Sequence, residues 1–128
     1  MVTQPAGWLR TIWALPTPAT LQGADFLLLG ANDAYAALVG VPRAALTGRD
    51  PVAMEPAEDR EGNLAQRQEA AAAAAQGLPL PPGQKRLIDP QGRERWFTAA
   101  AVNVAAQHEP PLWLTLWHEL TSEVAARG

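Results

Sequence analysis

The sequence contains no cysteine among its 128 residues. This absence excludes disulfides, thiolate nucleophiles, zinc sites built on cysteine and flavins attached through a cysteine. No apolar run approaches the length of about 18 residues that a membrane span needs. The N-terminus has neither the positive cluster nor the apolar segment of a targeting signal. We therefore expect a soluble, cytoplasmic domain with no membrane partner.

Basic residues are also few, and they are scattered along the chain. Ten Lys and Arg residues stand against thirteen Asp and Glu residues, which gives a net charge of -3. Isolated basic residues do not form the positive stripe that binds nucleic acid. We expect no direct nucleic-acid partner. A chain of this length is most simply one domain with a core that needs no covalent support.

The N-terminal third of the sequence contains a helix pattern followed by a hairpin pattern. Residues 7–15 place apolar side chains at spacings of three and four, which predicts a short amphipathic helix ended by Pro16. Residues 19–22 and 26–31 read as two strands, and the Gly-Ala-Asp turn at 23–25 joins them.

Two helices are predicted in the middle of the chain. The first covers residues 33–39, where Asn32 can cap the free amides of the first turn and Gly40 can end the helix. The second and longest is expected from Pro56 to Gln76, because proline and carboxylates favour a helix start and glycine follows as a stop.

The remaining sequence changes to a strand pattern. Residues 84–89 and 93–104 are predicted strands, joined by a type I turn with Asp, Pro and Gly in the positions that this turn favours. A final apolar strand is expected at 112–117. Two strands, several helices and three antiparallel strands indicate an α+β fold, with the helices packed on one face of a single sheet.

Several short motifs in this order resemble the PAS domain family. The stretch 26–48 is similar to the family segment in which a strand ends at Asn, a short helix follows, and a glycine precedes a second helix and another glycine. Asn32, Gly40 and Gly48 fall on those positions. Residues 54–60, MEPAEDR, resemble the family's His-Pro-Glu-Asp-Arg segment, with Glu55 in place of the histidine.

Two further motifs lie in the C-terminal part of the chain. Residues 87–96, LIDPQGRERW, resemble the family's Lys-Asp-Gly hairpin followed by Trp, with one extra residue between Asp89 and Gly92. Glu119-Leu120-Thr121 is similar to the Asp-Ile-Thr that closes the last strand of the family. The resemblance spans nearly the whole chain, from about residue 12 to residue 121.

The resemblance implies a PAS-like fold, with a five-stranded antiparallel sheet, helices on one face and an N-terminal capping helix. It divides the chain into an N-terminal amphipathic helix (1–15), a PAS domain (16–121) and the start of a connector helix to an output domain (122–128). Glu119 and Thr121 would mark the exit of the signal. The implied role is a non-catalytic input module of a larger signalling protein, such as a sensor histidine kinase of a two-component system.

The last predicted strand is apolar on both faces. Its leucines at 112, 114 and 116 alternate with Trp113 and Trp117, and we expect the leucines to face the helices and the tryptophans to face outward. An outer apolar face needs cover. Either the N-terminal helix covers it within one subunit, or a homodimer forms there. The predicted interface residues are Trp8, Ile12, Trp13, Trp113 and Trp117.

Three consecutive alanines, Ala99 to Ala101, place small side chains in the predicted central strand and could leave room for a small apolar ligand. The alternative is that larger helix residues fill this space, as is usual in close-packed interiors. If a pocket exists, the predicted lining residues are Leu29, Leu64, Ile88, Phe97 and Leu114. A slip of one residue in register would invert each face.

No cofactor is predicted. His108 lies in a predicted loop and His118 at a strand end, away from the helix that carries the haem ligand in some PAS domains. The flavin-binding photosensors of the family use a cysteine that this chain lacks. Two alternative functions stay open. One is a small-molecule sensor domain of a transcriptional regulator, and the other is an α+β cavity enzyme, which would require an interior carboxylate that none of the predicted inward positions supplies.

Overall fold

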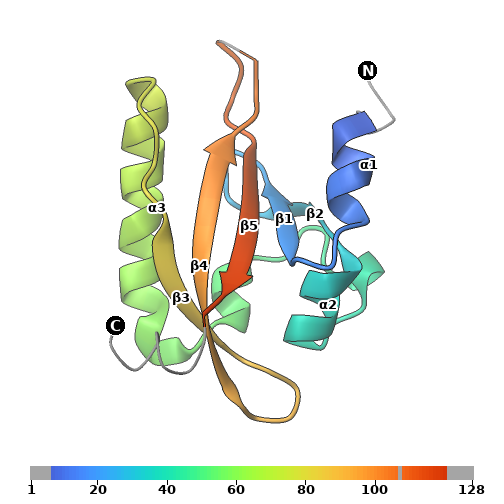
Figure 1. Cartoon of the computed structure of the whole chain (residues 1–128). Helices are drawn as coiled ribbons and strands as arrows, with labels where there is room; N and C mark the ends of the chain where they lie inside the picture. The colour runs from blue at the N-terminus through green and yellow to red at the C-terminus, as the bar shows by residue number, and fades with distance from the viewer. Residues whose placement is uncertain (1–6, 107, 121–128) are drawn as a thin grey trace.

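The computed structural model describes residues 7–106 and 108–120, and its centre is a five-stranded antiparallel sheet with the strand order β2-β1-β5-β4-β3 (Figure 1). The strands are β1 (Ala19–Gln22), β2 (Leu28–Ala31), β3 (Gly83–Ile88), β4 (Glu94–Asn103) and β5 (Trp113–Glu119). β5 pairs with both β1 and β4, so the two hairpins are joined through the last described strand. The predicted α+β fold with one antiparallel sheet is confirmed.

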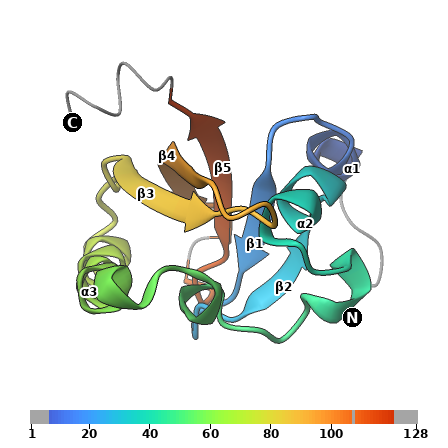
Figure 2. The same cartoon turned by 90° about the horizontal axis from the view of Figure 1, so that it is seen from below.

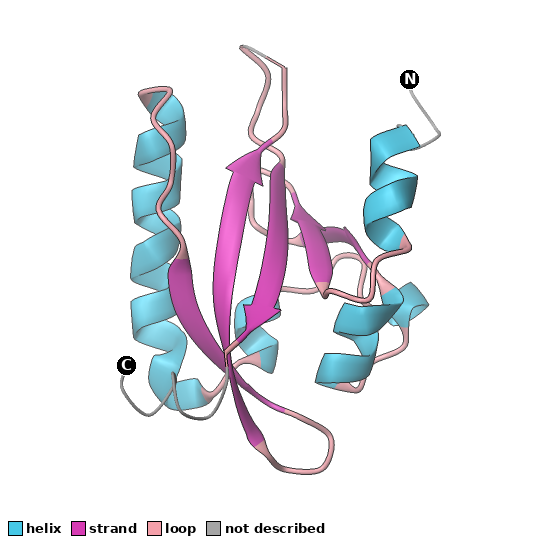
Figure 3. Cartoon of the chain, viewed as in Figure 1, coloured by secondary structure: helices cyan, strands magenta, loops and turns pink. Residues whose placement is uncertain are grey.

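The described helices lie on both sides of this sheet (Figures 2 and 3). They are α1 (Gly7–Trp13), α2 (Asp33–Val39) and α3 (Arg60–Ala75), with short 3-10 turns at Arg43–Ala45, Pro51–Met54 and Ala57–Asp59. We call the face covered by α2 and α3 the inner face. α1 lies against the opposite, outer face at β2, because a Cβ added at Gly30 would stand 3.3 Å from Trp13 Cζ2. The expected N-terminal capping helix is present.

Asn32 is fully buried and connects three elements. Its Oδ1 accepts hydrogen bonds from the backbone N–H of Ala19 and of Tyr35, each at 3.0 Å, so the same oxygen holds β1 and caps α2. Its Nδ2 donates to Thr17 O at 2.8 Å and lies 3.4 Å from Leu15 O, just after α1. This side chain therefore fixes the N-terminal helix, β1 and α2 to one another.

The long helix starts later than its sequence indicates. Pro56 precedes a 3-10 turn, in which the N–H of Asp59 donates to Pro56 O at 3.0 Å, and α3 begins only at Arg60. The tighter turn is common at helix N-termini. The helix ends as predicted, since Gly77 adopts the left-handed conformation with φ 67°.

The turn between β3 and β4 has the predicted form. The N–H of Gly92 donates to Asp89 O at 2.8 Å, and the Asp89 carboxylate accepts hydrogen bonds from the backbone N–H groups of Gln91 and Arg93 and from Arg93 Nε. Burial disfavours the charged carboxylate, but the bonds from Arg93 outweigh it and keep the pKa of Asp89 below its ordinary value.

The predicted orientation of the last strand is wrong. Trp113, Thr115 and Trp117 face the inner side, while Leu114 and Leu116 face the outer side. The pairing of β5 with β1 and β4 determines this orientation. Trp117 lies opposite Ala99 and joins the core, where its ring centre is 5.6 Å from that of Tyr35. Because both sets of side chains are apolar, alternation alone does not determine which set points inward.

Candidate ligand-binding site

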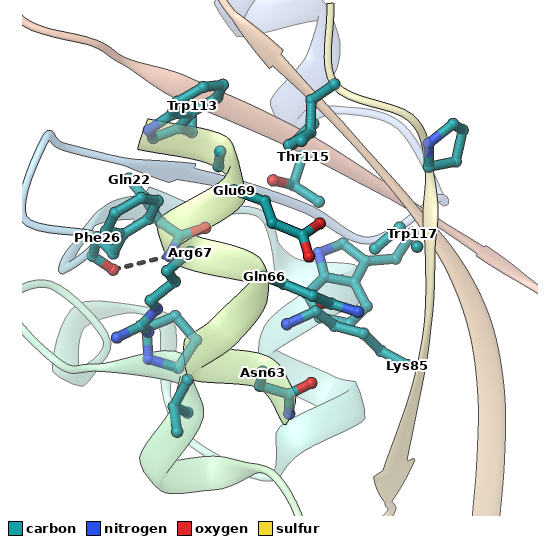
Figure 4. Close-up of a pocket in the computed structure, with 18 of the residues that line it drawn as sticks. Gln22, Phe26, Asn63, Gln66, Arg67, Glu69, Lys85, Trp113, Thr115 and Trp117 are labelled. Atoms are coloured by element: carbon teal, nitrogen blue, oxygen red, sulfur yellow. Dashed lines mark hydrogen bonds between the residues drawn. The ribbon is translucent and has the colours of Figure 1, made fainter. Parts of the chain in front are cut away.

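A cavity of about 200 Å³ lies between α3 and the inner face of the sheet (Figure 4). α3 contributes Asn63, Gln66, Arg67 and Ala70, whose spacing of three, four and seven residues places them on one side of the helix, and it also contributes the neighbouring Glu69. The 3-10 turn Pro51–Met54, the following Glu55 and the proline-rich segment Leu80–Pro82 complete the wall. Sequence reasoning predicted an apolar pocket, but this lining is largely polar on the helix side.

The sheet provides a floor of small side chains between two large ones. Trp113 and Trp117 stand on β5 with Thr115 between them (Figure 4). Ala101 lies opposite Thr115, and Ala99 lies opposite Trp117. The space therefore exists because β4 carries alanine where larger side chains would fill the interior. The prediction that the alanine run leaves room is correct for Ala99 and Ala101, while Ala100 faces the other side.

Phe26 forms the rim of the cavity at the end of β1 and β2. Its φ of 66° is unusual for a residue with a Cβ, and the residue therefore turns out of the predicted strand 26–31. Its ring stacks on Trp113 with a centre distance of 6.2 Å, and the guanidinium of Arg67 lies 5.3 Å from the ring centre. Gln22 Nε2 donates to Phe26 O at 2.7 Å and holds this backbone in place.

Glu55 places a buried carboxylate in the cavity wall. Asn63 Nδ2 donates to Glu55 Oε1 at 2.6 Å, while Oε2 has no hydrogen-bond partner. Lys85 Nζ lies 3.6 Å from Oε2, which is close enough for an ion pair but too long for a hydrogen bond. Only 1% of the Glu55 side chain is exposed. A buried acceptor without a donor is costly, so this oxygen indicates a place for another group.

Burial raises the pKa of Glu55, and the positive charges of Lys85 and Arg67 oppose that rise only in part. The pKa of Tyr35 is also raised, mainly by burial and further by the negative charge of Glu55. The Tyr35 hydroxyl is the second buried side-chain atom without a partner in the described chain. Two buried polar groups that influence each other electrostatically therefore both lack a hydrogen-bond partner.

Arg67, by contrast, has a charged partner. Its guanidinium forms two hydrogen bonds with the Asp50 carboxylate, which in turn caps the turn at Pro51–Met54 by accepting from the N–H of Val52. The hydrogen bonds from Arg67 lower the pKa of Asp50 below its ordinary value, against the effect of burial. This pair holds the middle of α3 to the segment that carries Glu55.

Of the five predicted lining residues, none lines this cavity. Leu29 is 50% exposed, because it is the extra residue where the pairing shifts between Leu21 and Gln22. Leu64 is 43% exposed and lies one position away from the inward side of α3. Ile88 is 46% exposed, since Leu87 is the residue of β3 that points inward.

The other two predicted lining residues are buried elsewhere. Phe97 faces inward as expected, but it packs edge-on against Trp117 in the core, with ring centres 6.1 Å apart. Leu114 is on the outer face, because its neighbours Trp113 and Thr115 point into the cavity. The error is the inverted orientation of β5 described above.

The predicted interface residues separate into two groups. Trp13 and Ile12 lie on α1, half-buried, and Trp13 packs over Gly30 of the same chain. The side chain of Trp8 lies outside the described part of the structure. Trp113 and Trp117 are buried on the inner face, so their assignment to an outer contact is wrong.

The predicted signal exit is described only in part. Glu119 ends β5, and its carboxylate accepts hydrogen bonds from Arg95 Nε at 2.8 Å and Arg95 Nη2 at 2.6 Å. These bonds raise the pKa of Arg95 and lower that of Glu119. Thr121 and the predicted connector at 122–128 lie outside the described residues.

The described residues contain neither a metal-binding cluster nor a membrane-spanning helix. Across positions 7–106 and 108–120, no three His, Asp or Glu side chains come together as metal ligands. In the same part of the chain, no helix has the length and apolar character to cross a bilayer. His108 lies in a loop with φ 71°, and His118 is exposed on β5.

Sequence reasoning missed the polar residues of the cavity, above all Glu55. The argument against an enzyme assumed that no carboxylate lies in the interior, and on this point it was wrong. One signal was available, since Glu55 replaces the histidine of the family segment that MEPAEDR resembles. Its partners Asn63 and Lys85 lie 8 and 30 positions further along the chain, and only the fold brings them together.

No family model and no curated protein sequence matches the chain. Solved structures do match its fold. A PAS domain from Colwellia psychrerythraea has a TM-score of 0.71 and 14% identity, covering 89% of this chain and 94% of that one. A PAS domain from a two-component sensor histidine kinase has a TM-score of 0.66 and 16% identity, covering 87% and 91%.

A third similar structure is the PAS domain of the RpfR quorum-sensing receptor from Cronobacter turicensis, in complex with BDSF. Its TM-score is 0.66 at 11% identity, and the match covers 94% of this chain and all of that one (100%). Identities this low establish a common fold and leave function to the site itself. The chain has the PAS fold, as its motifs predicted.

Proposed function

We propose that the chain is the non-catalytic sensory input domain of a larger signalling protein, such as a sensor histidine kinase, and that it responds to a small molecule in the cavity under α3. The observation that carries this proposal is the cavity with the unpartnered Glu55 oxygen in its wall. Native interiors rarely leave both space and a buried acceptor unfilled. The similar histidine kinase domain and the quorum-sensing domain solved with BDSF support this role.

In this proposal, one strand contacts the ligand and carries the signal. β5 lines the cavity with Trp113, Thr115 and Trp117 and ends at Glu119, which is bound to Arg95 of β4. A ligand that favours one packing of the tryptophans over another would shift this strand. The output domain would receive the shift through the residues that follow Glu119.

Filling the cavity tests the proposal. Ala101→Leu places apolar atoms in the space between Trp113 and Trp117, so it should abolish ligand binding and raise the free energy of unfolding by about 0.5–2 kcal/mol. Fragment binding is measured by NMR with a library of small ring compounds, and stability by urea unfolding. Ala100→Leu on the outer face is the matched control, and it should keep binding. The proposal is contradicted if the wild-type protein binds no fragment, or if Ala101→Leu binds the same fragments equally well.

We also propose that the domain forms a homodimer through α1 and the outer face of the sheet. Figures 1 and 2 show α1 beside β1 and β2, with no described helix over the outer face of β3, β4 and β5. On that face Val102 is 58% exposed beside Leu114. Association would bury this apolar surface.

Charge on this surface tests the dimer. Val102→Lys should shift a concentration-dependent dimer to monomer in sedimentation velocity, while Gln68→Lys, at an exposed position of α3 on the other side of the sheet, serves as the control. A wild-type protein that stays monomeric at every concentration contradicts the dimer. A deletion of residues 1–15 is less informative, because Asn32 is bonded to the backbone of this segment.

Proton transfer is the second candidate function, and Glu55 is the observation that favours it. A buried carboxyl group with a raised pKa, in a cavity, is suited to act as a general acid or base. Cyclohexanone in deuterium oxide is a simple probe. If Glu55 is a base, the wild-type protein should exchange the α-hydrogens faster than Glu55→Gln, and equal rates exclude this activity toward ketones.

A further inference from the structure

Two aromatic side chains bound the cavity on the sheet side. Trp113 and Trp117 lie four residues apart on the same side of β5, so their indoles form two walls separated by the short side chain of Thr115. Ala99 and Ala101 continue the floor. An apolar cavity of about 150 Å³ is known to hold benzene. The cavity here, about 200 Å³, therefore has room for one ring with a small substituent.

The polar side of the cavity indicates which groups that substituent must present. Glu55 Oε1 is occupied by Asn63, whereas Oε2 is buried and free to accept one hydrogen bond. Lys85 Nζ stands 3.6 Å from this same oxygen. A ligand that donates to Oε2 thus meets an ammonium donor immediately beside it. A donor and an acceptor are required next to each other.

The charges around Glu55 favour a neutral polar group on the ligand. The Glu55 carboxylate is balanced by Lys85, and the Arg67 guanidinium is balanced by Asp50, while Glu69 adds a carboxylate from an exposed position of α3. An added anion would lie close to Glu55, and an added cation would lie close to Lys85. Beside the buried Glu55–Lys85 pair, either charge loses its hydration without gaining an unpaired partner.

We infer that the cavity takes a neutral, planar ring compound whose polar edge carries a hydrogen-bond donor beside an acceptor, as in a primary carboxamide. The donor binds Glu55 Oε2, the acceptor binds Lys85 Nζ, and the ring lies between Trp113 and Trp117. This inference rests on the proposed ligand-binding function and adds the chemical class of the ligand.

Benzamide is the probe, because it combines one ring with a neutral donor and acceptor. Benzoate, benzamidine, toluene and decanoate are the matched comparisons, which replace the amide by an anion, a cation, no polar group, or an aliphatic acid. Dissociation constants are measured by NMR titration of the indole N–H signals of the tryptophans. Benzamide should bind at least about tenfold more tightly than each of the others, as expected from one buried charged hydrogen bond.

Glu55→Gln should weaken benzamide binding about tenfold, because an amide at this position loses the charged acceptor. Glu61→Gln, an exposed acid in the first turn of α3, is the control and should leave binding unchanged. Circular dichroism melts show whether each variant folds. If Glu55→Gln does not fold, Lys85→Met tests the second contact in the same way.

The possible outcomes distinguish a failure of this inference from a failure of the proposed ligand-binding function. Preferred binding of benzoate, benzamidine, toluene or decanoate overturns the ligand class, but such binding still supports a sensory cavity if Ala101→Leu abolishes it. Benzamide binding that Glu55→Gln and Lys85→Met leave unchanged also overturns the inference. If none of the five probes binds, the inference is wrong, and if the wider fragment library also fails, the proposed function falls with it.

Discussion

Two buried polar residues of this domain have opposite surroundings. Asn32 is fully buried, and both its oxygen and its nitrogen are used in hydrogen bonds to the backbone. Glu55 is equally enclosed, yet one of its two oxygens has no partner. Asn32 contacts only main-chain groups of neighbouring elements, whereas Glu55 faces a cavity.

The difference indicates what each residue contributes. A satisfied buried amide specifies how the chain packs, because each alternative packing would leave its groups unpaired. An unsatisfied buried carboxylate lowers stability, so its presence calls for another explanation, and a ligand supplies one. The same criterion therefore separates scaffold from site within one small domain.

The largest expected effect comes from removing the satisfied residue. Asn32→Ala leaves the N–H groups of Ala19 and Tyr35 and the carbonyl of Thr17 without partners in the interior. We expect a loss of about 3–5 kcal/mol in the free energy of unfolding, since each unpaired buried group costs about 1–3 kcal/mol. Urea unfolding measures this loss.

Asn103→Ala is the matched control for Asn32→Ala. Asn103 Oδ1 also accepts two backbone hydrogen bonds, from Ala105 and Leu112, but it is exposed. Water replaces those bonds, so the loss should stay below about 1 kcal/mol. Similar losses at the two positions would show that burial is not what distinguishes Asn32.

Glu55→Gln should act in the opposite direction. The pKa of Glu55 is raised in the folded protein, so the folded state binds this proton more tightly than the unfolded state does. The stabilisation is complete below the unfolded pKa, near 4.5, and is lost as pH rises through the folded pKa. Glu55→Gln should remove this decline. The free energy of unfolding of Glu55→Gln minus that of the wild type should therefore be larger near pH 7 than near pH 4.

Urea unfolding between these two pH values measures the slope for Glu55→Gln and for the control Glu61→Gln. The control should decline with pH as the wild type does, because Glu61 is exposed. An unchanged slope in Glu55→Gln would mean that the carboxylate has a donor in solution, and the comparison with Asn32 would no longer hold.

The smallest effect is expected at the end of β5. Glu119→Gln removes an ion pair with Arg95 that is largely open to solvent, and it should cost about 0.5 kcal/mol. The pKa of Glu119 is lowered by Arg95, so this contribution is present above the unfolded pKa and is lost as pH falls through the folded one. Thermal melts in low and high salt measure it. A loss of stability as large as that of Asn32→Ala would show that the number of hydrogen bonds a side chain makes affects stability more than its burial does.

Sequence patterns were sufficient for the parts of the fold that local chemistry controls. The cap at Asn32, the turn after Asp89 and the left-handed glycines at the ends of α2 and α3 follow from the preferences of single residues. The order of strands and helices then indicated the sheet.

The site could not be predicted in the same way. β5 is apolar on both faces, so only its pairing with β1 and β4 determines that the tryptophans point inward. Leu29 is turned outward by an irregularity in pairing, which no local pattern shows. Glu55, Asn63 and Lys85 form one cluster through contacts between distant segments.

The strand order has a consequence for how the chain reaches this structure during synthesis. β5 leaves the ribosome after the other described strands, yet it joins β1 on one side and β4 on the other. Until it emerges, the two hairpins have unpaired edges and no common core, which is a state prone to aggregation. Mutations that slow the docking of β5 should therefore lower the yield of folded protein in cells more than they lower equilibrium stability.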